Sequence, residues 1–368
     1  MTLAQFTPPE VPLTPTRTPD KVLVIGGTGH VGRVFLEQGL AMYGDDVEFR
    51  VLARSPKSAD GIPASVKRAP GDIRDRESLR RACEGFTADS IVFDSSTFID
   101  LSYTDPSGAI VGTNLDGPLN VLAVARELGC SLQKAHSQAG LAAPRTGSIT
   151  EDTVSDPAQE EDVYAKVPYL LAKKQVTREL LAAQAEGARV MVSYLVTPWG
   201  PYSREDALTL NIIRMSLRFR RYVYPTGVGI SYVDARDAAK AHWVAYMNDV
   251  HDHVVLSEPL TQREFVAHLG ESAGVSLGMH GLSRRPMLAV GDVMDWLHQH
   301  ALKTVTFPLS NAIVKLMFAN NAYSSAKARA LLGYAPRPSA STFGDHFQDL
   351  NNRGLLDTGA PRREVSIW

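Results

Sequence analysis

The sequence predicts an α/β protein with a doubly wound parallel sheet and a smaller mixed α/β lobe near the C-terminus. Two observations favour this class. A buried strand at residues 22–25 runs directly into glycines spaced three apart, Gly26, Gly29 and Gly32, and an amphipathic helix is expected from Arg33 to Tyr43. Further strand and helix patterns then alternate along the chain, which is typical of parallel sheets. With 368 residues, the chain can form one large core or two linked ones.

Composition excludes several classes of protein. Hydrophobic residues make up 44% and charged residues 21%, as in ordinary soluble globular proteins. Lys and Arg number 38 against 40 Asp and Glu, which argues against a nucleic-acid partner. Cys83 and Cys130 lack metal-ligand spacing, so we expect reduced thiols, no metal and a cytoplasmic location. Since no run of about 18 apolar residues occurs, no membrane span is expected.

The glycine turn predicts a Rossmann-type dinucleotide site. One glycine allows the tight turn, one allows the backbone to approach a pyrophosphate, and one allows the helix to pack closely on the sheet. The helix would direct its N–H groups and positive dipole end at the pyrophosphate. The alternative is a simple turn without a ligand. The candidate cofactor contacts here are Gly26, Thr28, Gly29, His30, Val31, Gly32 and Arg33.

The end of the second predicted strand, at residues 47–53, bears on the choice of cofactor. Arg54 stands there, where an acidic residue would bind the ribose 2′-hydroxyl of NAD and an arginine would accept the 2′-phosphate of NADP. We therefore expect NADP(H), with NAD as the weaker candidate. Arg33 is a possible second contact, although both arginines could simply be solvated.

The middle of the chain supplies the remaining elements of the sheet. Short strands are expected at 65–68 and 90–94, with a helix at 77–84 between them. A long helix is predicted from Asn114 to Leu128. The fifth strand, Cys130 to Ser137, is unusually polar and is assigned only from its place in the order. A sixth follows at 189–196.

A second informative stretch contains Tyr169 and Lys173. Residues four apart on a helix share a face, so both side chains can reach one site. An ammonium beside a phenol is expected to pull the tyrosine pKa down. Such a tyrosine can exchange a proton with a substrate oxygen while a nicotinamide carries a hydride. Alone, the spacing also occurs by chance on many helices.

Taken together, these motifs resemble the extended short-chain dehydrogenase/reductases, that is, the NAD-dependent epimerase/dehydratase group. Within that group, they are most similar to the branch of 3β-hydroxysteroid dehydrogenases and dihydroflavonol reductases. The resemblance covers about residues 21–350. The stretches that carry it are the glycine turn, Gly71-Asp72-Ile73, Asn114, Tyr169 with Lys173, Trp199-Gly200-Pro201-Tyr202, Ser231 to Ala241 and Lys327 to Tyr334.

This resemblance implies roles for further residues. Asp72 and Ile73 would contact the adenine, and Asn114 would support the lysine through water. Asp72 could instead cap its local turn, and Asn114 could have only a structural role. The third catalytic group is Ser137 or Gln138, and the register of the polar strand leaves this open. Other implied cofactor contacts are Ser95, Ser96, Thr97 and Val196, and implied substrate contacts are Thr97, Phe98, Trp199 and Tyr202.

The resemblance also implies how the chain divides. Residues 1–20 would be a Pro-rich extended tail, 21–196 with about 230–256 the NADP-binding domain, 197–229 with 257–350 the substrate lobe, and 351–368 a C-terminal tail. A helix at 206–221 ends in Arg214, Arg218, Arg220 and Arg221. These arginines fit an anionic substrate or a solvated helix end equally well.

The leading hypothesis is an NADP(H)-dependent ketoreductase or alcohol dehydrogenase of secondary metabolism. Its substrate would be a fairly apolar small molecule of polyketide, steroid or flavonoid type. A nucleotide-sugar epimerase or dehydratase with bound NAD is the second hypothesis. The third is a regulator that binds a dinucleotide without catalysis. Members of the group pair through two helices, so a homodimer is expected.

Overall fold

The computed structural model describes residues 13–55, 61–153, 160–203, 205, 208–300, 310–356 and 365–368, and the description below concerns these. Most of the predicted Pro-rich tail, the start of the predicted helix at 206 and residues 357–364 of the predicted C-terminal tail lie outside the described residues.

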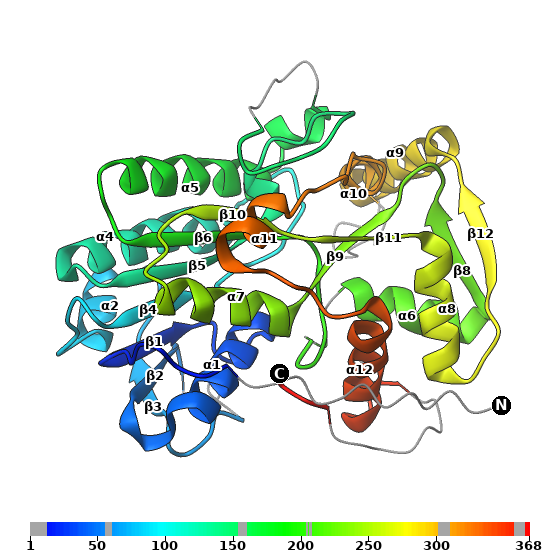
Figure 1. Cartoon of the computed structure of the whole chain (residues 1–368). Coiled ribbons are helices and arrows are strands. Elements are labelled where there is room, and N and C mark those ends of the chain that lie inside the picture. The colour runs from blue at the N-terminus through cyan, green and yellow to red at the C-terminus, as the bar shows by residue number, and fades with distance from the viewer. Residues whose placement is uncertain are drawn as a thin grey trace.

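A seven-stranded parallel sheet forms the centre of the protein and confirms the predicted fold class (Figure 1). Its strand order is β10-β6-β5-β4-β1-β2-β3. The order reverses beside β1, so the carboxyl ends of β1 and β4 border the crevice where such sheets bind ligands. The strands are β1 (Lys21–Ile25), β2 (Glu48–Ala53), β3 (Lys67–Pro70), β4 (Ile91–Asp94), β5 (Ser131–Ser137), β6 (Val190–Leu195) and β10 (His253–Leu256).

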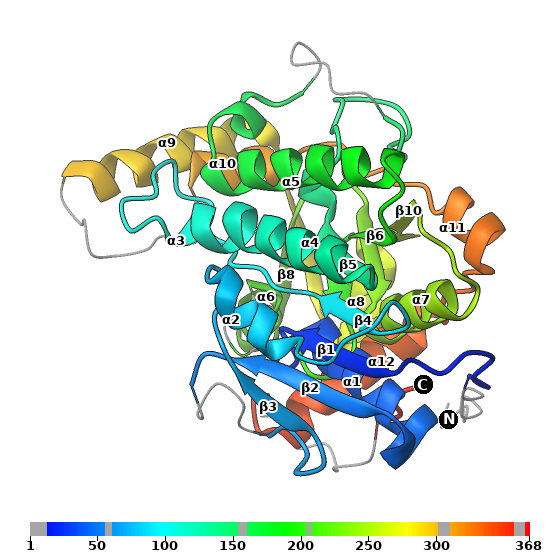
Figure 2. The same cartoon turned by 90° about the vertical axis from the view of Figure 1, so that its left-hand side faces the viewer.

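Helices cover both faces of this sheet (Figure 2). On one face, α1 (His30–Tyr43) and α7 (Ala235–Met247) pack on Val22 and Val24 of β1. The other face packs Leu23 and Ile25 under the remaining helices, because side chains alternate along a strand. These helices are α2 (Arg76–Ala82), α4 (Gly117–Leu128) and α5 (Pro168–Ala185).

The polar fifth strand is confirmed, and its polar side chains have partners inside the protein. Lys134 forms an ion pair with Asp94 of β4, at 2.7 Å. Gln133 contacts His242 of α7 at 3.0 Å, and His136 contacts the Lys173 carbonyl oxygen at 3.1 Å. Burying polar groups is tolerated when they are hydrogen-bonded, so apolar periodicity could not have identified this strand.

Two predicted helices differ in detail. Helix α1 begins at His30 instead of Arg33, so its first turn starts inside the glycine motif. The prediction of one regular helix from Asn114 to Leu128 is wrong at its start. There the chain forms α3 (Ala109–Val111) and a π-turn at Gly112–Asp116 before α4 begins. Asn114 lies in that wider turn, where its amide bonds the loop after β4.

The second half of the chain builds a lobe with its own apolar core, in which Trp199 packs against Phe265 and Phe343. Strands β7 (Pro198–Trp199), β9 (Ile230–Asp234) and β11 (Glu258–Leu260) form one small sheet. Strands β8 (Arg221–Pro225) and β12 (Gly278–Leu282) form another. The helices of the lobe are α6 (Leu208–Phe219), α8 (Gln262–Ala273), α9 (Arg284–His300), α10 (Asn311–Met317) and α12 (Ser339–Asn352). Helix α11 (Ala326–Leu332) instead packs Ala328 and Leu332 into the core of the seven-stranded sheet. The sequence patterns did not reveal β8, which follows a left-handed Arg220.

None of the helices in the described part of the chain combines the length and the apolar character needed to cross a membrane. Cys83 and Cys130 are free thiols, and both are buried.

Candidate functional site

The glycine turn forms a cradle of exposed backbone between β1 and α1. Gly26 has a φ of 81°, which favours glycine, and the Gly29 N–H donates to the Gly26 carbonyl oxygen at 2.8 Å. A Cβ atom on Gly32 would overlap that carbonyl, and one on Gly26 would lie 2.8 Å from Ser95 Oγ. No side chain fits at these points, so the backbone stays open to a ligand at the start of α1.

The turn after β4 lies against this cradle. Ser95 Oγ donates to the Ile25 carbonyl oxygen at 3.2 Å, and the Ser96 N–H donates to Asp94 Oδ1 at 2.8 Å. Ser96 Oγ is buried and has no hydrogen-bond partner among the described residues. Open backbone, a helix N-terminus and an unsatisfied hydroxyl at one sheet edge therefore fit a dinucleotide.

The two arginines predicted near the adenosine have different surroundings. Arg33 forms an ion pair with Glu37 at 2.6 Å, and its guanidinium lies 5.5 Å from the centre of the Tyr202 ring. Arg54 is exposed at the end of β2. Its charge helps to lower the pKa of Asp72, although a hydrogen bond from Arg74 has the larger effect.

Asp72 caps its own turn, as the structural alternative proposed. Its Oδ1 accepts hydrogen bonds from the Arg74 N–H at 2.9 Å and from Arg74 Nε at 3.0 Å. Ile73 is buried and packs beside Gly117 of α4. Contact of either residue with an adenine stays a prediction.

Tyr169 and Lys173 lie one turn apart on α5, buried under the carboxyl edge of the sheet. The Lys173 Nζ atom is 5.5 Å from the centre of the Tyr169 ring. The Tyr169 hydroxyl hydrogen-bonds with Ser137 at the end of β5 and with Thr97 after β4. The structure thus brings together four residues predicted for the site, from three separate segments.

The expectation that Lys173 lowers the pKa of Tyr169 is wrong in this structure. Burial raises the Tyr169 pKa, and the hydrogen bonds with Ser137 and Thr97 only partly offset it. Lys173 itself has a pKa well below its usual range, because burial and the positive charge of Lys134 disfavour its ammonium, while Asp94 favours it.

Of the two candidates for the third catalytic group, Ser137 is the one whose side chain hydrogen-bonds with the Tyr169 phenol. Ser137 is the last residue of β5, and its Oγ accepts from the Ala139 N–H at 3.2 Å. The same Oγ lies 3.3 Å from Gln138 Oε1. Gln138 begins the following 3-10 turn.

Asn114 contacts the loop after β4, and its support of Lys173 through water stays a prediction. Its Nδ2 donates to the Phe98 carbonyl oxygen at 2.7 Å, and its Oδ1 accepts from the Phe98 N–H at 3.1 Å. Oδ1 also lies 3.3 Å from Thr97 Oγ1. Asn114 therefore fixes the loop that presents Thr97 to Tyr169.

The remaining predicted residues have mixed positions around the site. His30 lies near the Gly200 carbonyl, and burial lowers its pKa to about 4. Trp199 belongs to the lobe core and Val196 to the core under α4 and α5. Tyr202 stacks near Arg33, and its N–H donates to Asp349 Oδ2 at 3.1 Å. Thr28, at the tip of the glycine turn, is exposed, and Val31 is buried.

Sequence reasoning missed Asp94 and Lys134 as residues of this site. Each is a charge inside an otherwise buried strand, and β4 and β5 pair so that the two residues are direct neighbours. Two opposite charges in adjacent predicted core strands are a signal that the sequence does contain.

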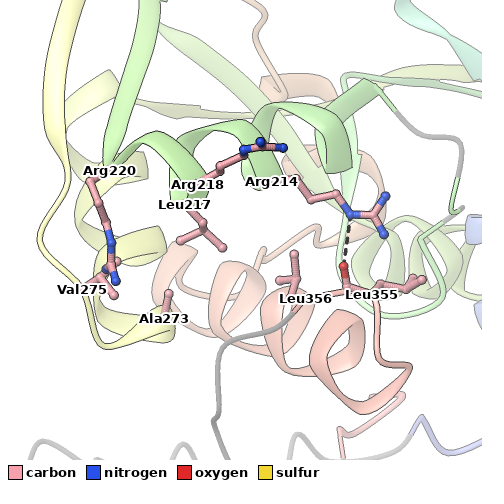
Figure 3. A pocket seen from close by; sticks show the side chains of 8 residues that line it. All are labelled: Arg214, Leu217, Arg218, Arg220, Ala273, Val275, Leu355 and Leu356. Carbon is pink, nitrogen blue, oxygen red and sulfur yellow. Dashed lines mark hydrogen bonds between the residues drawn. The ribbon is translucent and has the colours of Figure 1, made fainter.

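Arginines of α6 and of the residue that follows it line a separate pocket of about 420 Å³ (Figure 3). Arg214, Arg218 and Arg220 share its wall with Leu217 and with apolar residues of α8 and of the segment after α12. Arg214 Nε donates to the Leu355 carbonyl oxygen at 3.1 Å.

Comparison with known proteins agrees with this geometry. The family model described as the NAD dependent epimerase/dehydratase family matches residues 22–256. Sterol demethylase protein B of Methylococcus capsulatus is 23% identical over 339 residues, which are 91% of this chain and 99% of that protein.

Solved structures show the same fold. The crystal structure of gox2253 has a TM-score of 0.70 at 22% identity, covering 92% of this chain and 100% of its own. UDP-glucuronic acid 4-epimerase from Bacillus cereus, in complex with UDP-glucuronic acid and NAD, has a TM-score of 0.66 at 13% identity. It covers 90% of this chain and 99% of its own. Membership of the narrower branch of 3β-hydroxysteroid dehydrogenases and dihydroflavonol reductases stays a prediction. The chain belongs to the NAD-dependent epimerase/dehydratase family and is an extended short-chain dehydrogenase/reductase that uses a nicotinamide dinucleotide.

Proposed function

We propose that the protein is a ketoreductase or alcohol dehydrogenase that transfers a hydride between a nicotinamide dinucleotide and a carbonyl carbon. One observation carries this proposal: the Tyr169 phenol meets the Ser137 and Thr97 hydroxyls beside Lys173, at the sheet edge next to the glycine turn. The glycine cradle, Ser95 and Ser96 would hold the cofactor, which supplies or accepts the hydride when bound.

In this proposal each residue has a defined task. Ser137 donates a hydrogen bond to the substrate oxygen and orients it. Tyr169 gives that oxygen a proton during reduction and removes it during oxidation. Lys173 is the electrostatic partner of Tyr169, with its Nζ atom 5.5 Å from the centre of the tyrosine ring. Asn114 keeps the Thr97–Phe98 loop in place.

The substrate is proposed to be a fairly apolar small molecule. Phe98 and Ile99, which directly follow Thr97, are 44% and 68% exposed, so apolar surface lies next to the hydroxyl cluster. The name of the Methylococcus relative points to sterols and supports this class. The Bacillus epimerase, which binds UDP-glucuronic acid and NAD, supports the second candidate, a nucleotide-sugar epimerase or dehydratase.

For the cofactor we propose NADP(H), because Arg54 occupies the end of β2 and no acidic residue stands there. We also propose a cytoplasmic homodimer paired through α4 and α5. Light scattering on the purified protein would give its mass, and a monomer at micromolar concentration would contradict the pairing.

The decisive experiment substitutes Tyr169→Phe and measures turnover with a panel of ketones, sterols and nucleotide sugars, with NADPH and with NADH. Loss of one proton-transfer group should lower kcat by about 100-fold or more, while dinucleotide affinity stays nearly unchanged. Tyr164→Phe is the matched control, since Tyr164 is another buried tyrosine of the same apolar cluster. It should retain turnover.

Three results separate the hypotheses. Normal turnover in Tyr169→Phe rejects the assignment of the acid/base. Conversion of nucleotide sugars, but of no ketone, supports the epimerase or dehydratase. Saturable dinucleotide binding without turnover of any substrate in the panel supports a regulator without catalysis.

A further inference from the structure

A buried ion pair lies on the sheet side of the Tyr169–Lys173 helix. Lys134 Nζ donates to Asp94 Oδ2 at 2.7 Å, and the two side chains are 1% and 0% exposed. A buried pair costs solvation free energy and often stabilises a fold no better than apolar residues of the same size would. Stability alone therefore does not account for two charges at this place.

The carboxylate connects the pair to the cofactor turn. Asp94 Oδ1, the oxygen that does not face Lys134, accepts the Ser96 N–H at 2.8 Å. Ser96 precedes Thr97, whose hydroxyl bonds with Tyr169. Asp94 thus holds one end of the loop whose other end is fixed by Asn114.

The ammonium lies on the same side of the sheet as the catalytic helix. Lys134 and His136 are two residues apart on β5 and share a face, and His136 Nε2 contacts the Lys173 carbonyl oxygen at 3.1 Å. The charged or titratable groups facing Lys173 are Asp94 from β4, Lys134 and His136 from β5, and Tyr169 from its own helix. Burial keeps the pKa of His136 well below its usual range, so that imidazole is neutral.

We propose that Asp94 and Lys134 are positioning residues for hydride transfer. The pair holds the Ser95–Thr97 turn in place for the dinucleotide. It also provides the charged groups of the sheet that act on the Lys173 amine. The inference rests on the proposed function, because it assigns the pair to the same site. Its two charges act on Lys173 in opposite directions, with Lys134 the stronger.

The test compares Lys134→Met, Asp94→Asn and the double variant Asp94→Asn/Lys134→Met with the wild type. The titration of Lys173 is followed by its ¹³Cε resonance in ¹³C-lysine-labelled protein, assigned by its absence in Lys173→Met. The pH profile of kcat/KM and the affinity for NADP(H) and NAD(H) are measured alongside.

We expect the titration midpoint to move to higher pH in Lys134→Met and to lower pH in Asp94→Asn. The alkaline limb of the kcat/KM profile should shift in the same order. For each single variant, kcat/KM at about pH 9 is divided by kcat/KM at about pH 7, and this quotient should differ about tenfold between the two variants. Asp94→Asn should also weaken dinucleotide binding, because an amide accepts the Ser96 N–H less strongly than a carboxylate does.

If a single variant does not fold, the double variant provides the test, since its side chains have about the same volume as the native pair and bury no charge. Its Lys173 titration midpoint should move to higher pH, because the effect of Lys134, which lowers the midpoint, is the stronger of the two effects removed. Movement of both single variants in the same direction, or an unchanged midpoint in every folded variant, would overturn the proposal.

Asp237→Asn is the matched control, because Asp237 also forms a buried ion pair, with Arg337 at 2.7 Å. It should lower stability and leave the Lys173 titration in place. If the Lys173 midpoint shifts as expected but no carbonyl compound is turned over, the proposed function is rejected and the effect of the pair on Lys173 stands. If carbonyl compounds are turned over but the midpoint does not shift, the proposed function stands and the role of the pair is rejected.

Discussion

Tyr169 is 5% exposed and lies between two hydroxyl neighbours, and this environment determines its proton chemistry. Because burial raises its pKa, the phenol keeps its proton at neutral pH and is a proton donor. That state fits the reduction of a carbonyl, in which the oxygen must gain a proton. Oxidation of an alcohol would need the phenolate and should therefore be favoured by alkaline pH.

The prediction that the cofactor is NADP(H) depends on Arg54. Arg54→Ala should weaken NADP binding about tenfold and leave NAD binding nearly unchanged, because only NADP has a 2′-phosphate for the guanidinium to bind. Dissociation constants from fluorescence titration would measure both. Arg80→Ala on α2, which removes an arginine paired with Glu127, is the control and should change neither. Equal loss for both dinucleotides would contradict the assignment.

At the scale of elements, local signals predicted most of the sheet and failed where tertiary contacts decide. Strand β1 and its glycine turn follow from apolar content and spacing, and both are confirmed. The polar β5 could be placed only by its order, because its partners, Asp94 and His242, are distant in sequence. The π-turn at Asn114 depends on the loop after β4, and no helical periodicity signals it.

Local signals also predicted part of the candidate site. The pair Tyr169 and Lys173 was predicted from its four-residue spacing together with the glycine turn earlier in the chain, and the cradle at Gly26 from glycines spaced three apart after a strand. The choice between Ser137 and Gln138 needed the true register of β5. The rise in the Tyr169 pKa depends on burial, which no motif records.

His242, where α7 contacts β5 and β6, should make the free energy of unfolding depend on pH. His242 lies between Ser193 Oγ at 2.7 Å and Gln133 Oε1 at 3.0 Å, and burial lowers its pKa from 6.5 to about 3. The unfolded chain therefore binds this proton first as the pH falls. The contribution is present above pH 6.5 and is lost progressively toward pH 3, at about 1.4 kcal/mol per pH unit.

Urea unfolding between about pH 7 and pH 5 would measure this slope. His242→Gln should lower it by close to one proton, because the amide can bridge the same partners and does not titrate. His280→Gln is the control, since His280 is exposed on β12, and it should leave the slope as it is. An unchanged slope in His242→Gln would show that another group is responsible.

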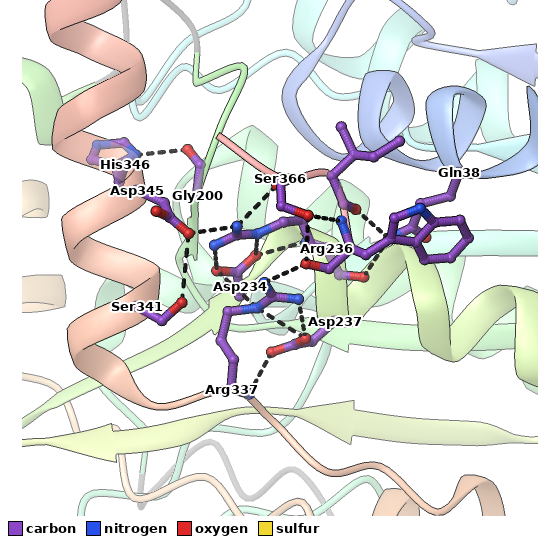
Figure 4. A network of polar contacts seen from close by, with 12 residues as sticks. Gln38, Gly200, Asp234, Arg236, Asp237, Arg337, Ser341, Asp345, His346 and Ser366 are labelled. Atoms are coloured by element: carbon purple, nitrogen blue, oxygen red, sulfur yellow. Dashed lines mark hydrogen bonds and ion pairs between the residues drawn. The ribbon is translucent and has the colours of Figure 1, made fainter. Parts of the chain in front are cut away.

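At the scale of the whole molecule, a buried charge network joins the two halves of the chain (Figure 4). Arg236 pairs with Asp234 at 2.8 Å and with Asp345 of α12 at 2.7 Å. Arg337 pairs with Asp237 at 2.7 Å. This network connects the start of α7, which packs on the sheet, with α12 of the lobe, so the elements that flank the site are held together by charges far apart in sequence.

The last residues of the chain complete this network from the side of α1. The Ser366 carbonyl oxygen accepts from Arg236 Nη1 at 3.0 Å, and the Trp368 oxygen accepts from Arg337 Nη1 at 3.0 Å. The Ile367 carbonyl accepts from Gln38 Nε2 at 2.9 Å. The C-terminus accordingly lies between α1 and α12 in Figure 1.

Deleting residues 365–368 should therefore destabilise the fold. Arg236 and Arg337 are 1% and 2% exposed, so each would lose an acceptor that water cannot readily replace, at roughly 1–3 kcal/mol per group. Urea unfolding would measure the loss. Ser366→Ala is the control, because it keeps every backbone acceptor, and its effect should be much smaller.

Since the contact on α1 is at Gln38 and not at the glycine turn, the folded deletion variant should bind NADP as the full chain does. A deletion that leaves the free energy of unfolding unchanged would mean that the arginines are satisfied by Asp234, Asp237 and Asp345 alone.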